Sequence, residues 1–251
     1  MNISDQELEI FARHLILKEF NNDALKNLLN FKLVMVGMGG IGCPATQYLV
    51  SAGIKNIKLI DSDVVEKNNL NRQTLYSFKD IGKYKSDIAK KKLLGINPEC
   101  KIESINDYLN STNIDKNFSN ASLIIDSTDN WKSMKLINKY CVDKSIPLIS
   151  ASAVGFDSQI TFFRNLPNKH LCLQCIFPNN IEPDLSRCDT VGVMGTATGL
   201  TGIIVAQKTI NYLLDEKIED NLMLMVNTKS LIITKIKIKK NKNCKCLEKN
   251  C

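Results

Sequence analysis

The chain has 251 residues, of which 44% are hydrophobic, and a formal net charge of +7. This length and apolar content are enough for one large domain with a substantial core. The charge does not indicate a nucleic-acid partner, because the lysines are scattered and only the segment 235–249 concentrates them. We find no signal peptide and no run of the roughly 18 apolar residues that a membrane span needs. We therefore expect a cytoplasmic protein without a membrane partner.

The apolar residues predict strands and helices in alternation. Ser4 opens a capping box, which predicts a first helix that runs to about Leu17. Strands are expected at 33–36, 57–60, 101–105, 123–125 and 148–152. Helices are expected from 42 onward, at 86–94 and at 130–143. This alternation is typical of an α/β protein with a Rossmann-like, doubly wound and mostly parallel sheet.

The pattern changes after residue 155. The sequence there predicts an extended segment at 159–163, a polar loop at 178–190, a helix at 196–214 and two closing strands. Isoleucines alternate with lysines at 233–238, which predicts a half-buried strand in a C-terminal antiparallel extension. Because no repeat or linker divides the chain, we expect a single domain over 1–251. Its parts are a helical arm at 1–30, a nucleotide-binding core at 31–155 and a remainder at 156–251.

A glycine-rich segment follows the first strand and opens a helix. Its pattern, Gly37-x-Gly39-x-x-Gly42, stands in the context that the dinucleotide-binding fingerprint requires. In such a segment the three glycines allow a tight turn, close approach of a phosphate and close packing of the helix on the strand. Asp61 ends the second strand, where a carboxylate can accept hydrogen bonds from ribose hydroxyls. These residues predict a nucleotide site.

A polar group that a dehydrogenase does not need follows this site. Asn69, Arg72 and Lys85 bring an amide and two cations toward the glycines, which suits a polyphosphate whose bond is broken. Asp126 and Asp129 follow the strand at 123–125, and we favour Asp129 as a ligand of Mg²⁺ beside a triphosphate. The alternative is that an Asp here caps the next helix, and Asp126 is as readily structural as functional.

Nine cysteines in a chain without a signal peptide point to metal binding or catalysis rather than to disulfides. Cys172-x-x-Cys175 and Cys244-Lys245-Cys246 supply four thiolates, which predict a structural Zn²⁺ site that fastens the C-terminal tail to the loop after residue 163. Cys251 is an alternative ligand, and unrelated free cysteines are the other interpretation.

A single cysteine, Cys188, lies beside Arg187 in the polar loop. A thiol near a cation can have a lowered pKa and act as a nucleophile, although a lone cysteine can equally be inert. Cys43, Cys100 and Cys141 lie in or beside predicted elements and are expected to be small buried side chains.

Together these residues resemble the E1-like adenylyltransferases of the ThiF, MoeB and HesA type, which activate ubiquitin-like sulfur carriers. The similarity covers nearly the whole chain. It rests on Gly37–Gly42 with the extra Gly40, Asp61-Ser62-Asp63, Asn69-Leu70-Asn71-Arg72-Gln73, Lys85, Thr128-Asp129-Asn130, Cys172-x-x-Cys175 and the terminal cysteine pair. Where the family usually has Arg-Tyr-x-Arg-Gln, this chain has Ile10–His14, so only Arg13 can be matched.

The resemblance implies a homodimer in which Arg13 of one subunit reaches the ATP phosphates of the other. It also implies that the segment 156–251 binds the carrier and contains a crossover loop and the zinc site. Cys188 would act in the later sulfur transfer. The implied nucleotide contacts are Asp61 on the ribose, Asn69, Arg72 and Lys85 on the phosphates, Asp129 on Mg²⁺, and Gly37, Gly39, Gly40, Gly42, Gln73 and Asn130 around them.

The reaction that the resemblance implies is attack by the carrier's C-terminal Gly-Gly carboxylate on the α-phosphate of ATP. Pyrophosphate leaves, and the acyl-adenylate is ready to take sulfur from a donor protein. The segment 151–156, with Glu182-Pro183 before Arg187-Cys188, resembles the thiamine-pathway type (ThiF) more than the molybdopterin type (MoeB). Activation of a molybdopterin-synthase carrier, an NAD-dependent oxidoreductase and a non-catalytic E1-like scaffold are the alternatives.

Overall fold

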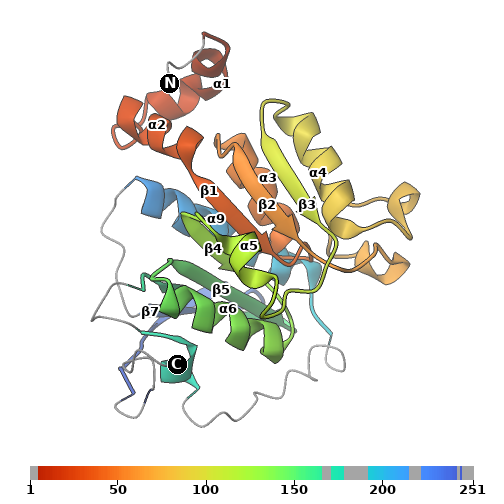
Figure 1. Cartoon of the computed structure of the whole chain (residues 1–251), viewed down its shortest axis with the longest axis vertical. Coiled ribbons are helices and arrows are strands. Elements are labelled where there is room, and N and C mark those ends of the chain that lie inside the picture. Colours follow the sequence, from red (N-terminus) through yellow and green to blue (C-terminus); the bar gives the residue numbers. More distant parts are fainter. Residues whose placement is uncertain (1–4, 166–170, 178–191, 215–221, 242–243, 245–251) are drawn as a thin grey trace.

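The computed structural model describes residues 5–165, 171–177, 192–214, 222–241 and 244. Within these residues eight strands form one mixed sheet in the order β3-β2-β1-β4-β5-β6-β7-β8 (Figure 1). The strands are β1 (Lys32–Val36), β2 (Asn56–Ile60), β3 (Lys101–Ile105), β4 (Leu123–Asp126), β5 (Leu148–Val154), β6 (Asp157–Phe163), β7 (Leu222–Asn227) and β8 (Ile232–Lys237). Strands β1 to β5 are parallel, and β5 to β8 pair antiparallel. The expected mostly parallel sheet with an antiparallel extension is confirmed.

The helices that the sequence predicted are also present. The described helices are α1 (Asp5–Leu15), α2 (Asn22–Asn30), α3 (Gly42–Ser51), α4 (Lys85–Ile96), α5 (Ile114–Phe118), α6 (Trp131–Asp143), α7 (Leu173–Ile176) and α9 (Gly195–Leu213). Helix α1 ends two residues earlier than expected. Helix α2 lies within the helical arm expected at 1–30. Helices α5 and α7 were not predicted, because each is too short to show a clear helical period.

The helices cover both faces of the sheet, and β1 shows why. Its side chains alternate, so that Leu33 and Met35 belong to the larger core, with α2, α3, α4 and α9. Val34 and Val36 point to the other face and pack in a second core with α5 and α6. A strand that is buried on both faces has to be apolar at every position, as β1 is after Lys32.

The order of the parallel strands places a crevice between β1 and β4. From β1 the chain moves outward through β2 to β3, and it then returns to the other side of β1 to form β4 and β5. The connections after β1 and β4 therefore diverge to opposite faces. In open α/β sheets ligands bind at the carboxyl ends of the strands at such a switch point.

The expectation of a half-buried strand near the C-terminus was wrong. β8 is the edge strand of the sheet, and all six of its residues are exposed, including the isoleucines on both of its faces. The alternating pattern correctly predicts a strand. It does not reveal that β7 is the only described neighbour of β8 and that no described helix covers it.

The helical arm is fixed to the core through α1. Phe11 is 1% exposed and packs against Gly53, whose φ is +110°. A Cβ on Gly53 would lie 2.9 Å from the Cζ of Phe11, so the position against which this ring packs requires a glycine. Lys55 forms ion pairs with Glu7 of α1 and with Glu99, which precedes β3.

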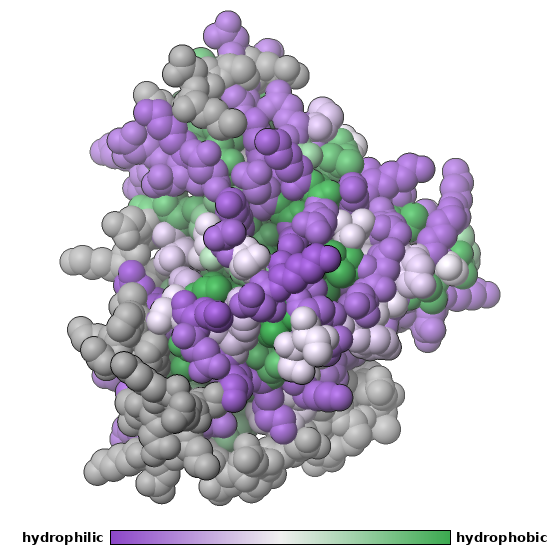
Figure 2. Space-filling model, viewed as in Figure 1, coloured by the Kyte–Doolittle hydropathy of each residue, from purple (hydrophilic) through white to green (hydrophobic). Residues whose placement is uncertain are grey.

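None of the helices in the described ranges is long and apolar enough to cross a bilayer. Figure 2 shows that hydrophilic side chains cover most of one face of the molecule, with apolar surface between them in small patches.

Replacing Gly53 with alanine should destabilise the fold by about 2–4 kcal/mol, because the new Cβ adds backbone strain at positive φ and overpacks the site of Phe11. Gly95→Ala is the matched control. It lies in α4 with no atom within 4 Å of the added Cβ, and it should stabilise by about 0.5–1 kcal/mol. Urea denaturation measures both values, and equal midpoints for the two variants would contradict the assigned role of Gly53.

Candidate functional site

The turn between β1 and α3 is built from glycines for steric reasons. A Cβ on Gly42 would lie 2.1 Å from the carbonyl oxygen of Gly37, which no side chain can tolerate. Gly37 itself has a φ of +91°, and its Cβ would lie 2.9 Å from the carbonyl oxygen of Ser127. The turn is therefore pressed between the start of α3 and the end of β4.

The two remaining glycines of this turn have different surroundings. A Cβ on Gly39 would have only the amide nitrogen of Gln73 nearby, at 3.8 Å, so this part of the turn opens into a cavity. A Cβ on Gly40 would lie 2.6 Å from the hydroxyl oxygen of Thr198 in α9. The extra glycine of the motif thus allows α9 to pack directly on the turn.

Asp61 joins the end of β2 to the glycine turn. Its carboxylate accepts hydrogen bonds from the N–H groups of Met38 (2.6 Å) and Asp63 (2.8 Å). Burial raises the pKa of Asp61, while nearby Lys85 and these two hydrogen bonds oppose that shift. A carboxylate held in this way keeps lone pairs that can accept a hydrogen bond from a hydroxyl group of a ligand.

Lys85 begins α4 and is almost fully buried. Its Nζ lies 2.8 Å from the Oδ2 of Asp63, and its N–H donates to the carbonyl oxygen of Asp63 at 2.9 Å. The hydroxyl of Tyr76 donates to the carbonyl oxygen of Met38 (2.8 Å) and lies 3.3 Å from that of Lys85. The ammonium group is thus held at the cavity wall by an aspartate that is itself half exposed.

The segment from Asn69 to Gln73 forms the opposite wall. The Asn69 amide is occupied locally, since it accepts from the N–H of Glu66 (3.1 Å) and donates to the side chain of Asn68 (2.7 Å). Arg72 donates to the carbonyl oxygen of Asn68 at 2.8 Å and lines the cavity. Gln73 is buried, and its Oε1 has no hydrogen-bond partner among the described residues.

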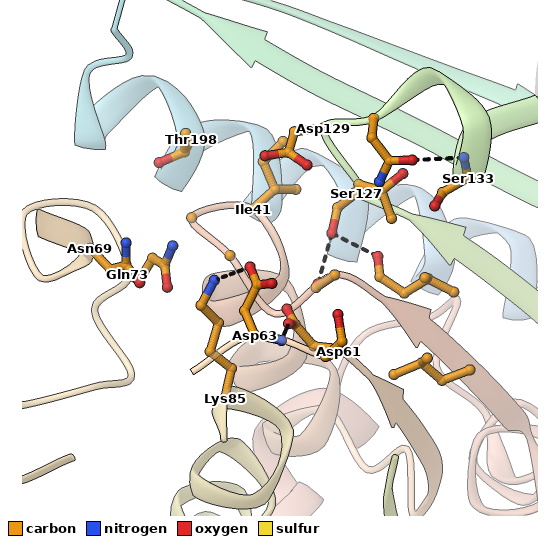
Figure 3. A pocket seen from close by; sticks show the side chains of 18 of the residues that line it. Ile41, Asp61, Asp63, Asn69, Gln73, Lys85, Ser127, Asp129, Ser133 and Thr198 are labelled. Atoms are coloured by element: carbon orange, nitrogen blue, oxygen red, sulfur yellow. Dashed lines mark hydrogen bonds and ion pairs between the residues drawn. The ribbon is translucent and has the colours of Figure 1, made fainter. Parts of the chain in front are cut away.

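The residues that follow β4 form another wall of the cavity. Asn130 caps α6 by accepting a hydrogen bond from the N–H of Ser133 at 2.8 Å. The alternative interpretation of the sequence, in which an aspartate caps this helix, is therefore wrong. Asp129 precedes it with an exposed side chain that lines the cavity. Figure 3 shows Asp129 on one side of the glycine turn and Asp63 with Lys85 on the other.

These walls enclose a cavity of about 980 Å³. Five acidic and two basic side chains line it: Asp61, Asp63, Glu66, Asp107 and Asp129 against Arg72 and Lys85. Arg13 is not in its lining, and it is exposed on α1. The residues of the core that the sequence indicated for nucleotide binding line this cavity, except Gly42, which lies behind the turn against Gly37, and Arg13 of the same chain lies elsewhere.

A cluster of cysteines lies at the other end of the sheet. The sulfur atoms of Cys172, Cys175 and Cys244 are all within 4.8 Å of one another, and those of Cys172 and Cys244 are 3.4 Å apart. Hydrogen bonds, above all from the Cys172 thiol, lower the pKa of Cys175 to about 5. Three converging thiol groups fit the ligand chemistry of Zn²⁺. Cys246, Cys251 and Cys188 lie outside the described residues.

The other cysteines of the core are buried, as the sequence predicted. Burial raises the pKa of Cys43 to about 12 and that of Cys100 to about 11, and it also raises the pKa of Cys141. These thiols therefore stay protonated and unreactive at neutral pH.

Four contributors to the site were not assigned from the sequence: Asp63, Tyr76, Ser127 and Thr198. Asp63 lies in the motif that includes Asp61, and this position was a signal that could have found it. Thr198 reaches Gly40 from a helix that begins more than 150 residues later, and no local pattern signals that contact.

Comparison with known proteins gives the same family over most of the chain. The model of the ThiF family matches residues 11–247. The SAMP-activating enzyme E1 of Haloferax volcanii is 30% identical over 246 residues, which cover 97% of this chain and 90% of that protein. The sulfur carrier protein ThiS adenylyltransferase of Escherichia coli is 33% identical over 84% of this chain and 83% of its own length.

Other relatives are longer or more distant. The adenylyltransferase and sulfurtransferase MOCS3 of Drosophila willistoni is 35% identical over 84% of this chain, which spans 46% of that protein. Among solved structures, Escherichia coli MccB has a TM-score of 0.76 at 24% identity, covering 97% of this chain and 81% of MccB. PaaA has a TM-score of 0.80 at 21% identity, covering 94% and 84% of the two chains. These two structures show the same fold.

We expect the purified protein to contain about one Zn²⁺ per chain, because the thiols of Cys172, Cys175 and Cys244 converge. Cys172→Ser should release the metal and lower the melting temperature, since metal binding is coupled to folding. Cys100→Ala, a buried cysteine outside the cluster, should keep the zinc. Elemental analysis under reducing conditions measures the content, and zinc-free wild-type protein would contradict the site.

Proposed function

Because this chain belongs to the ThiF family, we propose that it adenylates the C-terminal Gly-Gly carboxylate of a ubiquitin-like sulfur-carrier protein with ATP. The observation that carries the proposal is the cavity at the β1–β4 switch point, where the glycine turn, Arg72, Lys85 and Asp129 converge. The family's relatives are named adenylyltransferases and activating enzymes, and the protein is accordingly an adenylyltransferase.

In the proposed reaction a carboxylate oxygen of the carrier attacks the α-phosphorus of ATP. The bond from the α-phosphorus to the bridging oxygen breaks, and pyrophosphate leaves with that oxygen and its electron pair. The carboxylate needs no deprotonation at neutral pH. The residues of the cavity therefore act by positioning the reactants and by neutralising charge as it moves to the leaving group.

Each side chain has a place in that scheme. Asp61 would accept hydrogen bonds from the ribose, and the open face at Gly39 would admit the phosphates. Lys85 and Arg72 would pair with the phosphate oxygens, with Gln73 and Asn130 beside them. Asp129 would hold Mg²⁺, which supplies further neutralisation of the triphosphate. Asn69 supports the wall rather than offering a free amide.

The charge of the cavity supports a homodimer. Five acidic against two basic side chains do not neutralise a triphosphate, so further positive charge has to come from Mg²⁺ and from outside this chain's own cavity. Arg13 is exposed on α1, and the apolar side chains of Ile10 on the same helix and of Ile16 and Leu17 just after it are exposed as well. We propose that Arg13 of a second copy completes the site.

The other classes of function explain less of the cavity. An NAD-dependent oxidoreductase leaves Arg72, Lys85 and Asp129 without a role. A non-catalytic scaffold would not need these groups to converge on an open glycine turn. The carrier that we propose is of the thiamine type, supported by the segments 151–156 and 182–188, while relatives named for both ThiS and MOCS3 chemistry match at similar identity.

Later steps are proposed from the sequence. Cys188 is the candidate thiol for sulfur transfer from a donor protein, and the zinc site would hold the C-terminal tail against the carrier-binding part. The segment with Cys188 lies outside the described residues, so its role stays a prediction.

We expect the protein with Mg²⁺ to exchange labelled pyrophosphate into ATP only when a carrier ending in Gly-Gly is added. Asp129→Ala should abolish exchange, because the metal ligand is lost, and Arg72→Ala should lower its rate by ~10²–10³. A ThiS-type carrier should support faster exchange than a molybdopterin-synthase carrier.

Asp143→Ala and Lys91→Ala are the matched controls for this assay, since both side chains are exposed and do not line the cavity. If Asp129→Ala and Arg72→Ala exchange pyrophosphate at the wild-type rate, the assignment of the site is wrong. Faster exchange with the molybdopterin-type carrier would overturn only the choice of carrier.

If Arg13 acts across the dimer, two inactive variants should complement each other. Arg13→Ala and Asp129→Ala, co-expressed with different affinity tags, form mixed dimers in which one of the two sites is intact. Random pairing should give about a quarter of the wild-type exchange rate. Inactivity of the mixed dimers, purified through both tags, would place Arg13 in its own chain's site, and full activity of Arg13→Ala alone would remove it from the reaction.

A further inference from the structure

A buried carboxylate at the end of β4 has no role in the proposed chemistry. Asp126 is 2% exposed, and no lysine or arginine pairs with it in the described part of the chain. Burial raises its pKa to about 6, with the charge of Asp129 adding to the effect. A buried carboxylate without a counter-ion costs free energy that an apolar residue in this strand would avoid. Its presence therefore calls for a compensating role.

Thr128 is the partner of this carboxylate. The Oδ1 of Asp126 accepts hydrogen bonds from the N–H of Thr128 at 3.0 Å and from its hydroxyl at 2.7 Å. Short-range bonds of this kind fix a turn in the backbone, because they replace the strand pairing that ends here.

The same segment is held at two further points. The hydroxyl of Ser127 donates to the carbonyl oxygen of Gly37 at 2.9 Å, which ties the segment to the glycine turn. Asn130 caps α6. Asp129 lies between these anchors, and its carboxylate makes no hydrogen bond or ion pair with the described residues. The backbone anchors on either side of Asp129 therefore fix the direction of its side chain. Figure 3 shows Ser127 and Asp129 beside the glycine turn.

We propose that Asp126 is a positioning residue. Acting through Thr128, it orients the segment so that Asp129 faces the cavity, and it does so as a hydrogen-bond acceptor and not as a ligand of the metal. The inference rests on the proposed function, in which Asp129 holds the Mg²⁺ of the nucleotide.

A positioning acceptor and a metal ligand make different demands on the side chain of Asp126. Asparagine keeps an oxygen acceptor for Thr128 but loses the negative charge, whereas alanine loses both. A positioning acceptor therefore tolerates Asp126→Asn and does not tolerate Asp126→Ala. A metal ligand that depends on its charge is impaired by both substitutions.

The experiment titrates Mg²⁺ against the binding of α,β-methylene-ATP by calorimetry in the full-length protein. Asp126→Ala should raise the half-saturating Mg²⁺ concentration about 10-fold, as the loss of an outer-shell partner typically does. Asp126→Asn should stay close to wild type. Thr128→Val, which removes the hydroxyl donor, should shift the titration in the same direction as Asp126→Ala, and Thr128→Ser should rescue it.

The outcomes separate this inference from the proposed function. Equal losses in Asp126→Asn and Asp126→Ala would overturn the positioning role, and so would an unchanged Mg²⁺ dependence in Asp126→Ala. Thermal unfolding shows whether Asp126→Ala is folded, and Thr128→Val carries the test if it is not. A wild-type protein that binds no Mg²⁺-nucleotide would overturn the proposed function and this inference with it.

Discussion

The contact between Gly42 and the carbonyl oxygen of Gly37 is the constraint on which the rest of the site depends. Only 2.1 Å separates that oxygen from the position of a Cβ on residue 42, so α3 can begin this close to the end of β1 only with a glycine there. The other walls of the cavity are attached to this turn. Asp61 binds the N–H of Met38, Ser127 binds Gly37, and Thr198 packs on Gly40.

The electrostatic arrangement of the cavity differs from that of the whole protein. The chain carries a net positive charge, yet acidic side chains outnumber basic ones around the cavity. Lys85 is buried and already paired with Asp63, so it is held in place before any ligand arrives. Opposed charges at fixed positions favour a ligand that brings both signs, as a polyphosphate does together with a divalent cation.

The antiparallel half of the sheet connects this cavity to the cysteine cluster. β5 ends beside the cavity, where Ala151 and Ala153 contribute to the lining, and the chain then turns into β6. Cys172 follows β6 and Cys244 follows β8, so their contact joins two segments that are 72 residues apart. β8 remains an exposed edge strand, which proteins seldom leave uncovered without a partner.

The sequence by itself predicted the parallel core, and it named candidate nucleotide-binding residues that the structure gathers around one cavity. Short apolar runs bounded by glycines and polar residues have few alternatives to buried strands, and glycines at fixed spacing have a steric cause. The local order of residues was thus sufficient to select Gly37–Gly42, Asp61 and Asp129 as candidate site residues. It also indicated Cys172 and Cys175 as a pair, because their spacing lies within one short segment.

Only the tertiary structure decided which distant groups meet. The contacts of Thr198 with Gly40 and of Lys85 with Asp63 depend on strand order and on the direction in which side chains leave their elements. The exposure of β8 was likewise invisible in its alternating pattern, because periodicity reports two faces of a strand and not what covers them. Local spacing is encoded in the chain, whereas burial and long-range contact are properties of the packed molecule.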